Sequence, residues 1–135
     1  MIPASPRRVW ADVRNLASHV EWMEEAVALR FTSDQTTGVG TTMECITRVG
    51  PLRTKDLMAV TEWDEGRRIG IRHNGAVTGT GEFRLRRRPR GGTRFTWKER
   101  LRFPWWMGGP LGGLIGARVL KRVWKRNLDN LAARF

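Results

Sequence analysis

Apolar positions at the amino terminus recur with helical spacing, and two short helices are predicted there. The first is expected over residues 6–15, because Ser5 and Pro6 are the residue types of an N-cap and a first helical position. A second short helix is expected to begin at Ser18, where Glu21 follows at the spacing of a capping box. Both helices precede the first strand pattern.

From residue 27 to residue 103, apolar and polar residues alternate with a period of two, which predicts six antiparallel strands joined by turns. The last strand follows Gly91 and Gly92 and has two opposite faces. One face is apolar with a single carboxylate and consists of Phe95, Trp97, Glu99, Leu101 and Phe103. The other face is almost wholly basic and consists of Arg94, Thr96, Lys98, Arg100 and Arg102.

After Pro110, apolar residues at helical spacing predict one long helix that runs to the end of the chain. Two short helices, six strands and one long helix predict a layered α+β domain in which a curved antiparallel sheet wraps round the C-terminal helix. We expect residues 1–135 to form a single domain, because a chain of this length buries one core.

Basic residues outnumber acidic ones, with 25 Lys and Arg against 13 Asp and Glu and a formal net charge of +12. Such a charge makes nucleic acid a candidate partner. Most of the basic residues are arginine, a bias that a GC-rich genome produces without any function. Nucleic acid is therefore the least favoured of the partners considered below.

Several residue types restrict the chemistry. Cys45 is the only cysteine, and His19 and His73 are the only histidines, so we expect no intrachain disulfide, no metal site and no cofactor. Tyrosine is absent, which removes the phenol as a proton donor. Because no secretory signal or apolar run of about 18 residues is evident, the expected location is the cytoplasm.

Five short segments follow one another in the order of a known family. They are residues 2–6 (IPASP), 9–10 (VW), 22–23 (WM), 60–63 (VTEW) and 92–97 (GTRFTW). Together they resemble the polyketide cyclase/dehydrase group of the START-like (SRPBCC, Bet v 1-like) superfamily over essentially the whole chain. The resemblance implies a helix-grip fold with an apolar cavity between the concave sheet and the long helix. Such proteins bind lipids, polyketides, hormones or other hydrophobic small molecules.

Members of this superfamily usually carry a strand before the segment that corresponds to residues 2–6. Here only Met1 and Ile2 stand at that place, so the first strand is expected to be short or missing. Unpaired backbone on neighbouring strands would then need a cover. A partner chain in a homodimer, an altered sheet and a longer native amino terminus are the three explanations.

Inward-facing strand positions predict which residues contact a ligand. The predicted contacts are Phe83, Phe95, Trp97, Leu101, Arg72, Trp63, Ile71 and Trp105. Gly112, Gly113 and Gly116 in the long helix would leave space for the ligand. The alternative for each aromatic residue is that it builds core, since pockets are a minority of buried surface.

Glu99 is the first candidate for acid/base chemistry, because it shares a strand face with Trp97 and Leu101 and would be partly desolvated there. His73 is the second, since it shares a face with Ile71 and its imidazole can transfer a proton near neutral pH. The alternatives are a polar cavity-lining role for Glu99 and a structural role for His73. No nucleophile has an evident base beside it, so a covalent mechanism has no support.

The loop over residues 103–110 joins the last strand to the long helix and contains Trp105 and Trp106. It is expected to act as a lid over the cavity or to pack against its open end. A membrane-surface association also stays open, because the paired tryptophans precede Arg118 and Arg122.

Outward basic rows are expected to face each other on two neighbouring strands, with Arg84 and Arg86 on one and Arg94 and Lys98 on the other. Like charges at opposed positions destabilise a sheet, and an acidic partner would relieve the repulsion. The resemblance suggests an acidic acyl carrier protein as that partner, and solvent ions are the alternative.

The sequence therefore predicts a domain that binds a hydrophobic or aromatic small molecule in an internal cavity. As an enzyme it would guide polyketide cyclisation or dehydration by holding a chain folded, while Glu99, His73 or Arg72 polarises a carbonyl or moves a proton. The alternative is a non-catalytic lipid or metabolite carrier. Nucleic-acid binding through the basic face is the third hypothesis.

Overall fold

The computed structural model describes residues 2–49, 52–75, 77–102 and 109–135, and its side chains except at positions 49, 52 and 109–117. The elements are, in chain order, α1 (Pro6–Val13), the 3-10 helix η1 (Leu16–Glu21), β1 (Ala26–Phe31), β2 (Thr42–Val49), β3 (Leu52–Asp64), β4 (Arg68–Asn74), β5 (Thr78–Arg87), β6 (Thr93–Arg102) and α2 (Gly109–Ala132).

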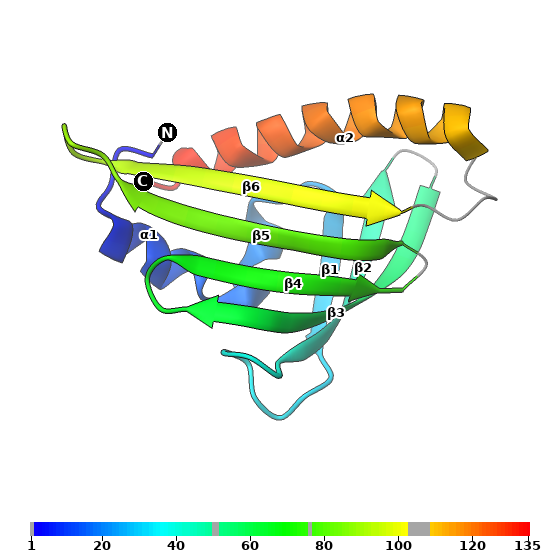
Figure 1. Cartoon of the computed structure of the whole chain (residues 1–135), viewed down its shortest axis with the longest axis horizontal. Helices are drawn as coiled ribbons and strands as arrows, with labels where there is room; N and C mark the ends of the chain where they lie inside the picture. The colour runs from blue at the N-terminus through cyan, green and yellow to red at the C-terminus, as the bar shows by residue number, and fades with distance from the viewer. Residues whose placement is uncertain (1, 50–51, 76, 103–108) are drawn as a thin grey trace.

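The six strands form one antiparallel sheet in the order β1-β2-β3-β4-β5-β6, so every strand pairs with its neighbour along the chain. Figure 1 shows that the sheet curls, with β1 and β2 crossing behind the other strands and α2 running along the side of β6. The predicted α+β helix-grip fold with six strands and a long C-terminal helix is confirmed.

The amino-terminal helices begin for different reasons. In α1 the hydroxyl of Ser5 accepts a hydrogen bond from the backbone N–H of Arg8 at 3.3 Å, as expected for an N-cap. The capping box predicted at Ser18 is wrong, because η1 begins after Asn15. Ser18 lies inside η1, and its hydroxyl donates backward to the carbonyl oxygen of Asn15 at 2.7 Å.

A single residue pair stands at the place of the short or missing first strand. The N–H of Ile2 donates to the carbonyl oxygen of Thr93, and the N–H of Thr93 donates to that of Ile2, both at 2.9 Å. The buried Thr93 hydroxyl also donates to the carbonyl oxygen of Ala4 at 2.7 Å. The amino-terminal segment therefore covers the beginning of β6. The predicted homodimer and longer native terminus stay predictions.

Aromatic side chains fill the half of the concave face that lies beside α1. Trp22, only 1% exposed, has its ring centroid 6.0 Å from that of Phe83 and 6.5 Å from that of Phe95. Trp97 adds a further ring, 5.4 Å from Phe83. These perpendicular and tilted contacts are the favoured geometry for aromatic pairs. They form a wall that separates the packed core from the rest of the concave face.

The carboxyl-terminal half of α2 is held by one fully buried amide. The Asn127 side chain accepts from the backbone N–H of Glu24 at 3.0 Å and donates to the carboxyl group of Glu25. One turn away, Asn130 donates to the carbonyl oxygen of Trp22 at 3.3 Å. Polar contacts thus fix α2 against the segment between η1 and β1.

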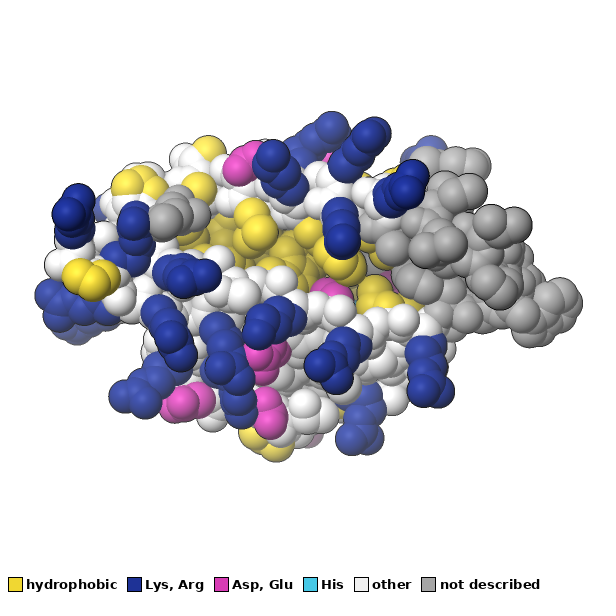
Figure 2. Space-filling model, turned by 45° about the horizontal axis from the view of Figure 1, so that its top comes forward, with side chains coloured by type: hydrophobic (Ala, Val, Ile, Leu, Met, Phe, Trp, Pro, Cys, Tyr) yellow, Lys and Arg dark blue, Asp and Glu magenta, His cyan; other side chains and the backbone are white. Residues whose placement is uncertain are grey.

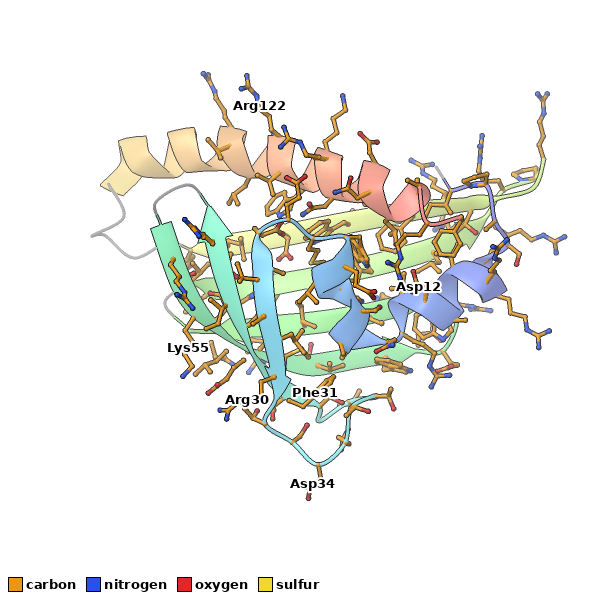
Figure 3. All side chains as sticks on the ribbon, turned by 180° about the vertical axis from the view of Figure 1, so that it is seen from behind. Asp12, Arg30, Phe31, Asp34, Lys55 and Arg122 are labelled. Atoms are coloured by element: carbon orange, nitrogen blue, oxygen red, sulfur yellow. The ribbon has the colours of Figure 1, made fainter. Side chains whose placement is uncertain are left out.

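The last residues of the chain bind back onto α1. The Arg134 guanidinium donates to both carboxylate oxygens of Asp12, at 2.7 and 2.8 Å. Asp12 points toward this end of α2 in Figure 3, and the two chain ends lie near α1 in Figure 1. A bidentate pair of this kind adds geometric specificity to the helix position.

Asn127→Ala is expected to lower the free energy of unfolding by about 1–3 kcal/mol, because it leaves a buried N–H and a buried carboxyl group without partners. Urea denaturation measures the change. The matched control is Asp129→Ala on the exposed side of the same helix, which should change stability by less than about 0.5 kcal/mol. Equal effects of the two variants would contradict the role assigned to Asn127.

Candidate functional site

A cavity of about 320 Å³ occupies the part of the concave face that the aromatic wall leaves unfilled. It lies between the sheet, the end of η1 and α2, and most of its walls are apolar. The apolar lining residues are Leu16, Met23, Ala26, Leu29, Met43, Met58, Ile69, Ile71, Val77, Phe83, Trp97, Leu101, Val119, Leu120 and Trp124. Figure 2 shows a hollow with a hydrophobic floor, flanked by Lys and Arg side chains.

Two inward glycines on β5 leave room above the centre of the sheet. Gly79 pairs with His73 on one side and Leu101 on the other, and Gly81 pairs with Ile71 and Glu99. Gly79 has φ +140°, and a Cβ there would meet the backbone of β6. A Cβ at Gly81 would clash with the carboxylate of Glu99. The Glu99 side chain therefore lies over Gly81 and crosses β5.

By crossing β5, Glu99 reaches a histidine two strands away. Its Oε2 lies 3.1 Å from Nε2 of His73, and its Oε1 accepts from the indole N–H of Trp97 at 2.9 Å. The side chains of Glu99 and His73 are only 6% and 12% exposed. Because a carboxylate only accepts, Nε2 of His73 carries the proton in this contact, and Nδ1 of a neutral ring keeps a free lone pair. The two residues that the sequence predicted for acid/base chemistry therefore lie in direct contact.

Two further carboxyl groups line the cavity on the other side. Asp56 on β3 accepts from the Thr47 hydroxyl at 2.6 Å through Oδ2, while its Oδ1 is buried without a hydrogen-bond partner. Glu25 accepts from Asn127. Burial raises the pKa of Glu25, and the neighbouring charges of Glu24 and Glu99 raise it further.

Cys45 also lines the cavity, opposite Asp56 on β2. Burial raises the pKa of its thiol to about 11, and the charges of Asp56 and Glu25 act in the same direction. A thiol of this kind stays protonated near neutral pH and is a poor nucleophile.

The structure gathers six of the predicted site residues around the cavity: Glu99, His73, Phe83, Trp97, Leu101 and Ile71. Their shared inward parity explains the agreement in position, since one face of a strand contacts one space. The roles of these residues stay predictions.

Three predicted ligand contacts need correction, because they do not line the cavity. Arg72 is exposed on the outer face, since it alternates with Ile71 and His73. Phe95 packs inside the aromatic core. Trp63 stacks edge-on against Trp10, with ring centroids 5.4 Å apart, at the α1 end of the sheet. Inward parity alone does not reveal at which end of a strand the cavity begins.

Of the predicted lid over residues 103–110, residues 103–108 with Trp105 lie outside the described residues, and Gly109 and Pro110 belong to α2. The surroundings of Gly112, Gly113 and Gly116 are not described either, so the space that they are expected to leave for a ligand stays a prediction. Sequence reasoning missed Glu25 and Asp56. Asp56 shares a strand face with apolar Met58, and this shared face was a signal for an inward carboxylate.

The predicted repulsion on the outer face is smaller than expected. Only Arg86 and Arg94 stand directly opposite each other, because the register places Glu82 opposite Lys98. The Glu82 carboxylate also lies 2.6 Å from Nε of Arg84 on that face. Interspersed carboxylates therefore compensate much of the basic row.

Within the described part of the chain, no group of three or more His, Cys, Asp or Glu side chains is arranged to hold a metal ion. In the same part, no helix combines the length and apolar character needed to cross a bilayer.

The sequence matches one protein family over its whole length. Residues 1–135 match the sequence model of a family described as polyketide cyclase / dehydrase and lipid transport. No curated protein matches the sequence. The likeness to the family that the sequence motifs predicted is confirmed.

Solved structures share the fold at low sequence identity. A protein from Thermus thermophilus superposes with a TM-score of 0.78 at 21% identity, covering 98% of this chain and 90% of the other. The Zhui aromatase/cyclase from Streptomyces sp. R1128 gives 0.78 at 15% identity, covering 98% and 87%. A START superfamily protein from Mycobacterium smegmatis gives 0.73 at 11% identity, covering 98% and 90%.

His19 provides a pH test of the packing beside the cavity. Its Nε2–H donates to the carbonyl oxygen of Val13 at 2.7 Å, and its ring packs against Trp22 and Phe83. Burial lowers the pKa of His19 from 6.5 to about 4. The unfolded chain therefore binds this proton below about pH 6.5, whereas the folded chain binds it only near pH 4.

Stability is expected to fall as the pH drops from about 6.5 to about 4, by at most about 3 kcal/mol from this group. Urea denaturation at several pH values measures the slope. His19→Gln keeps a donor for Val13 but cannot titrate, so its slope over this interval should be shallower. Identical slopes for the two proteins would contradict a buried neutral His19.

Proposed function

Because the chain belongs to the polyketide cyclase/dehydrase and lipid transport family, we propose that it binds a hydrophobic or aromatic small molecule between the sheet and α2. The observation that carries the proposal is the cavity of about 320 Å³ with predominantly apolar walls. This volume lies in the range of roughly 300–1,000 Å³ that is typical of small-molecule sites. A ligand there would gain affinity by removing apolar surface from water.

Ligand binding is expected to quench tryptophan fluorescence, because Trp97 and Trp124 line the cavity. A titration with the neutral probe N-phenyl-1-naphthylamine tests this. Thr54→Phe places a ring into the cavity lining and should weaken probe binding by about tenfold, or ~1.4 kcal/mol.

The matched control is Thr61→Phe, which makes the same substitution at an exposed position of the same strand. It should leave the probe affinity unchanged. Absence of saturable quenching in the wild-type protein, or equal weakening by both variants, would contradict binding in this cavity. Far-ultraviolet circular dichroism of both variants establishes that they are folded.

A specific observation also supports catalysis, namely the buried contact between His73 and Glu99. We infer that Nδ1 of His73 removes a proton from the carbon next to a ligand carbonyl, while Glu99 fixes the ring and stabilises its positive charge. Such proton transfer is a step of both cyclisation and dehydration of poly-ketone chains. The non-catalytic alternative is a carrier in which the same groups only hold the ligand.

Exchange of carbon-bound hydrogen for deuterium distinguishes the two alternatives without knowledge of the natural substrate. The bicyclic ketone 2-tetralone is expected to exchange its α-hydrogens faster in heavy water when the protein is present, as followed by proton NMR. His73→Gln should lower the acceleration by about 10² or more, since it removes the base. Glu99→Gln should lower it while retaining tetralone affinity.

The control variant is His19→Gln, which removes the other histidine of the cavity lining, and it should retain most of the acceleration. If the protein binds tetralone without accelerating exchange, the carrier alternative is supported and the catalytic one is contradicted.

A further inference from the structure

The polar part of the cavity lining is acidic and contains no lysine or arginine. Its described carboxyl groups include Glu25, which directly precedes β1, Asp56 on β3 and Glu99 on β6. Glu82 also borders the cavity, but its carboxylate pairs with Arg84 on the outer face. The residues whose side chains lie outside the described part include no Lys or Arg in the sequence. The cavity lining therefore offers no lysine or arginine side chain to a ligand.

The many basic residues of the chain instead occupy the outside. In Figure 3, Arg30 and Lys55 lie on the outer side of the curled sheet, and Arg122 projects from α2 away from the sheet. Arg30 and Lys55 pair there with Glu44, at 2.8 and 3.5 Å. The chain as a whole has a net charge of +12, and its Lys and Arg side chains lie on the surface. The cavity, in contrast, is lined by carboxyl groups.

The interior carboxyl groups keep capacity to accept hydrogen bonds. Asp56 has one buried oxygen without a partner, and the other accepts only from Thr47. Glu99 uses one oxygen for His73 and one for Trp97, and each carboxylate oxygen has two lone pairs. A ligand that offers O–H or N–H groups would satisfy these acceptors, and the apolar walls would hold its carbon skeleton.

A ligand with an acid group would meet the opposite situation. Its negative charge would lose water on entry and find no ammonium or guanidinium group, while the charges of Glu99 and Asp56 would repel it. The neutral donors His19 and Cys45 are poor compensation, because the His19 N–H is already used by Val13. The unused hydrogen-bond acceptors and the negative charge of the carboxylates therefore both favour ligands with hydrogen-bond donors over ligands with an acid group.

We propose that the cavity selects apolar or aromatic ligands that carry hydroxyl or amino hydrogen-bond donors, and that it rejects ligands that carry a carboxylate, sulfonate or phosphate group. This inference rests on the proposed function, since it concerns the ligand of the same cavity. It excludes free fatty acids and the head groups of anionic lipids from the interior. Hydroxylated aromatic compounds and amines fit.

The test uses the full chain and four compounds with one ring system: naphthalene, 2-naphthol, 2-naphthylmethylamine and 2-naphthoate. Each competes with N-phenyl-1-naphthylamine near neutral pH, in salt of about 150 mM to screen binding of the acid to the basic surface. The naphthol and the amine should compete at least about tenfold better than 2-naphthoate, which is ~1.4 kcal/mol.

Charge-removing variants then identify the source of the selectivity. The double variant Glu25→Gln, Asp56→Asn should bind 2-naphthoate about tenfold more tightly than the wild type does, which is ~1.4 kcal/mol. The ratio between the affinities for 2-naphthol and 2-naphthoate should therefore be smaller in the variant. Glu44→Gln removes a carboxylate from the outer face instead and should change none of the ratios. The wild-type series tests the proposal by itself if the double variant fails to fold.

The outcomes separate the two proposals. Binding of the probe together with 2-naphthoate affinity equal to or above that of the naphthol would overturn the selectivity inference and leave cavity binding intact. Failure of the probe and of all four compounds to bind would overturn both proposals. Either order of affinity between the amine and the naphthol supports the inference. Tighter binding of the positively charged amine would indicate ionised carboxyl groups in the cavity, and tighter binding of the naphthol would indicate protonated ones.

Discussion

The position of α2 over the concave sheet is the constraint on which the rest of the structure depends. Without the helix, the inner face of six curled strands would expose its apolar surface to water. Asn127 fixes the helix by hydrogen bonds to Glu24 and Glu25, and Arg134 fixes its end to Asp12. These attachments all lie on the last turns of α2, so the fold is anchored at the end where the core is packed.

The same concave sheet face carries both a packed core and a cavity, because bulky and small residues are distributed unequally along the strands. At one end, Trp22, Phe83 and Phe95 interlock and leave little space. At the other end, Gly79 and Gly81 have no side chain to fill the concave face. The consequence is a domain with a packed aromatic core in one part of its interior and a cavity of about 320 Å³ in another.

Polar groups inside this cavity are few, and most are held by specific neighbours. Glu99 links β6 to β4 through His73 and is oriented by Trp97. These contacts fix the orientation of the His73 ring, which is what the proposed proton transfer would require. Glu99, together with Glu25 and Asp56, lines the cavity with carboxyl groups, whereas the chain as a whole is basic.

The sequence by itself determined the element types, the family and the inward parity of Glu99 and His73, because strand alternation and helix periodicity are local properties. Tertiary structure decided which inward residues meet the cavity. It assigned Phe95 to the core and brought Glu99 into contact with His73 across β5. It also placed Asp56 among the cavity walls. These outcomes depend on strand register and sheet curvature, which place Glu99 opposite Gly81 and which no local pattern encodes.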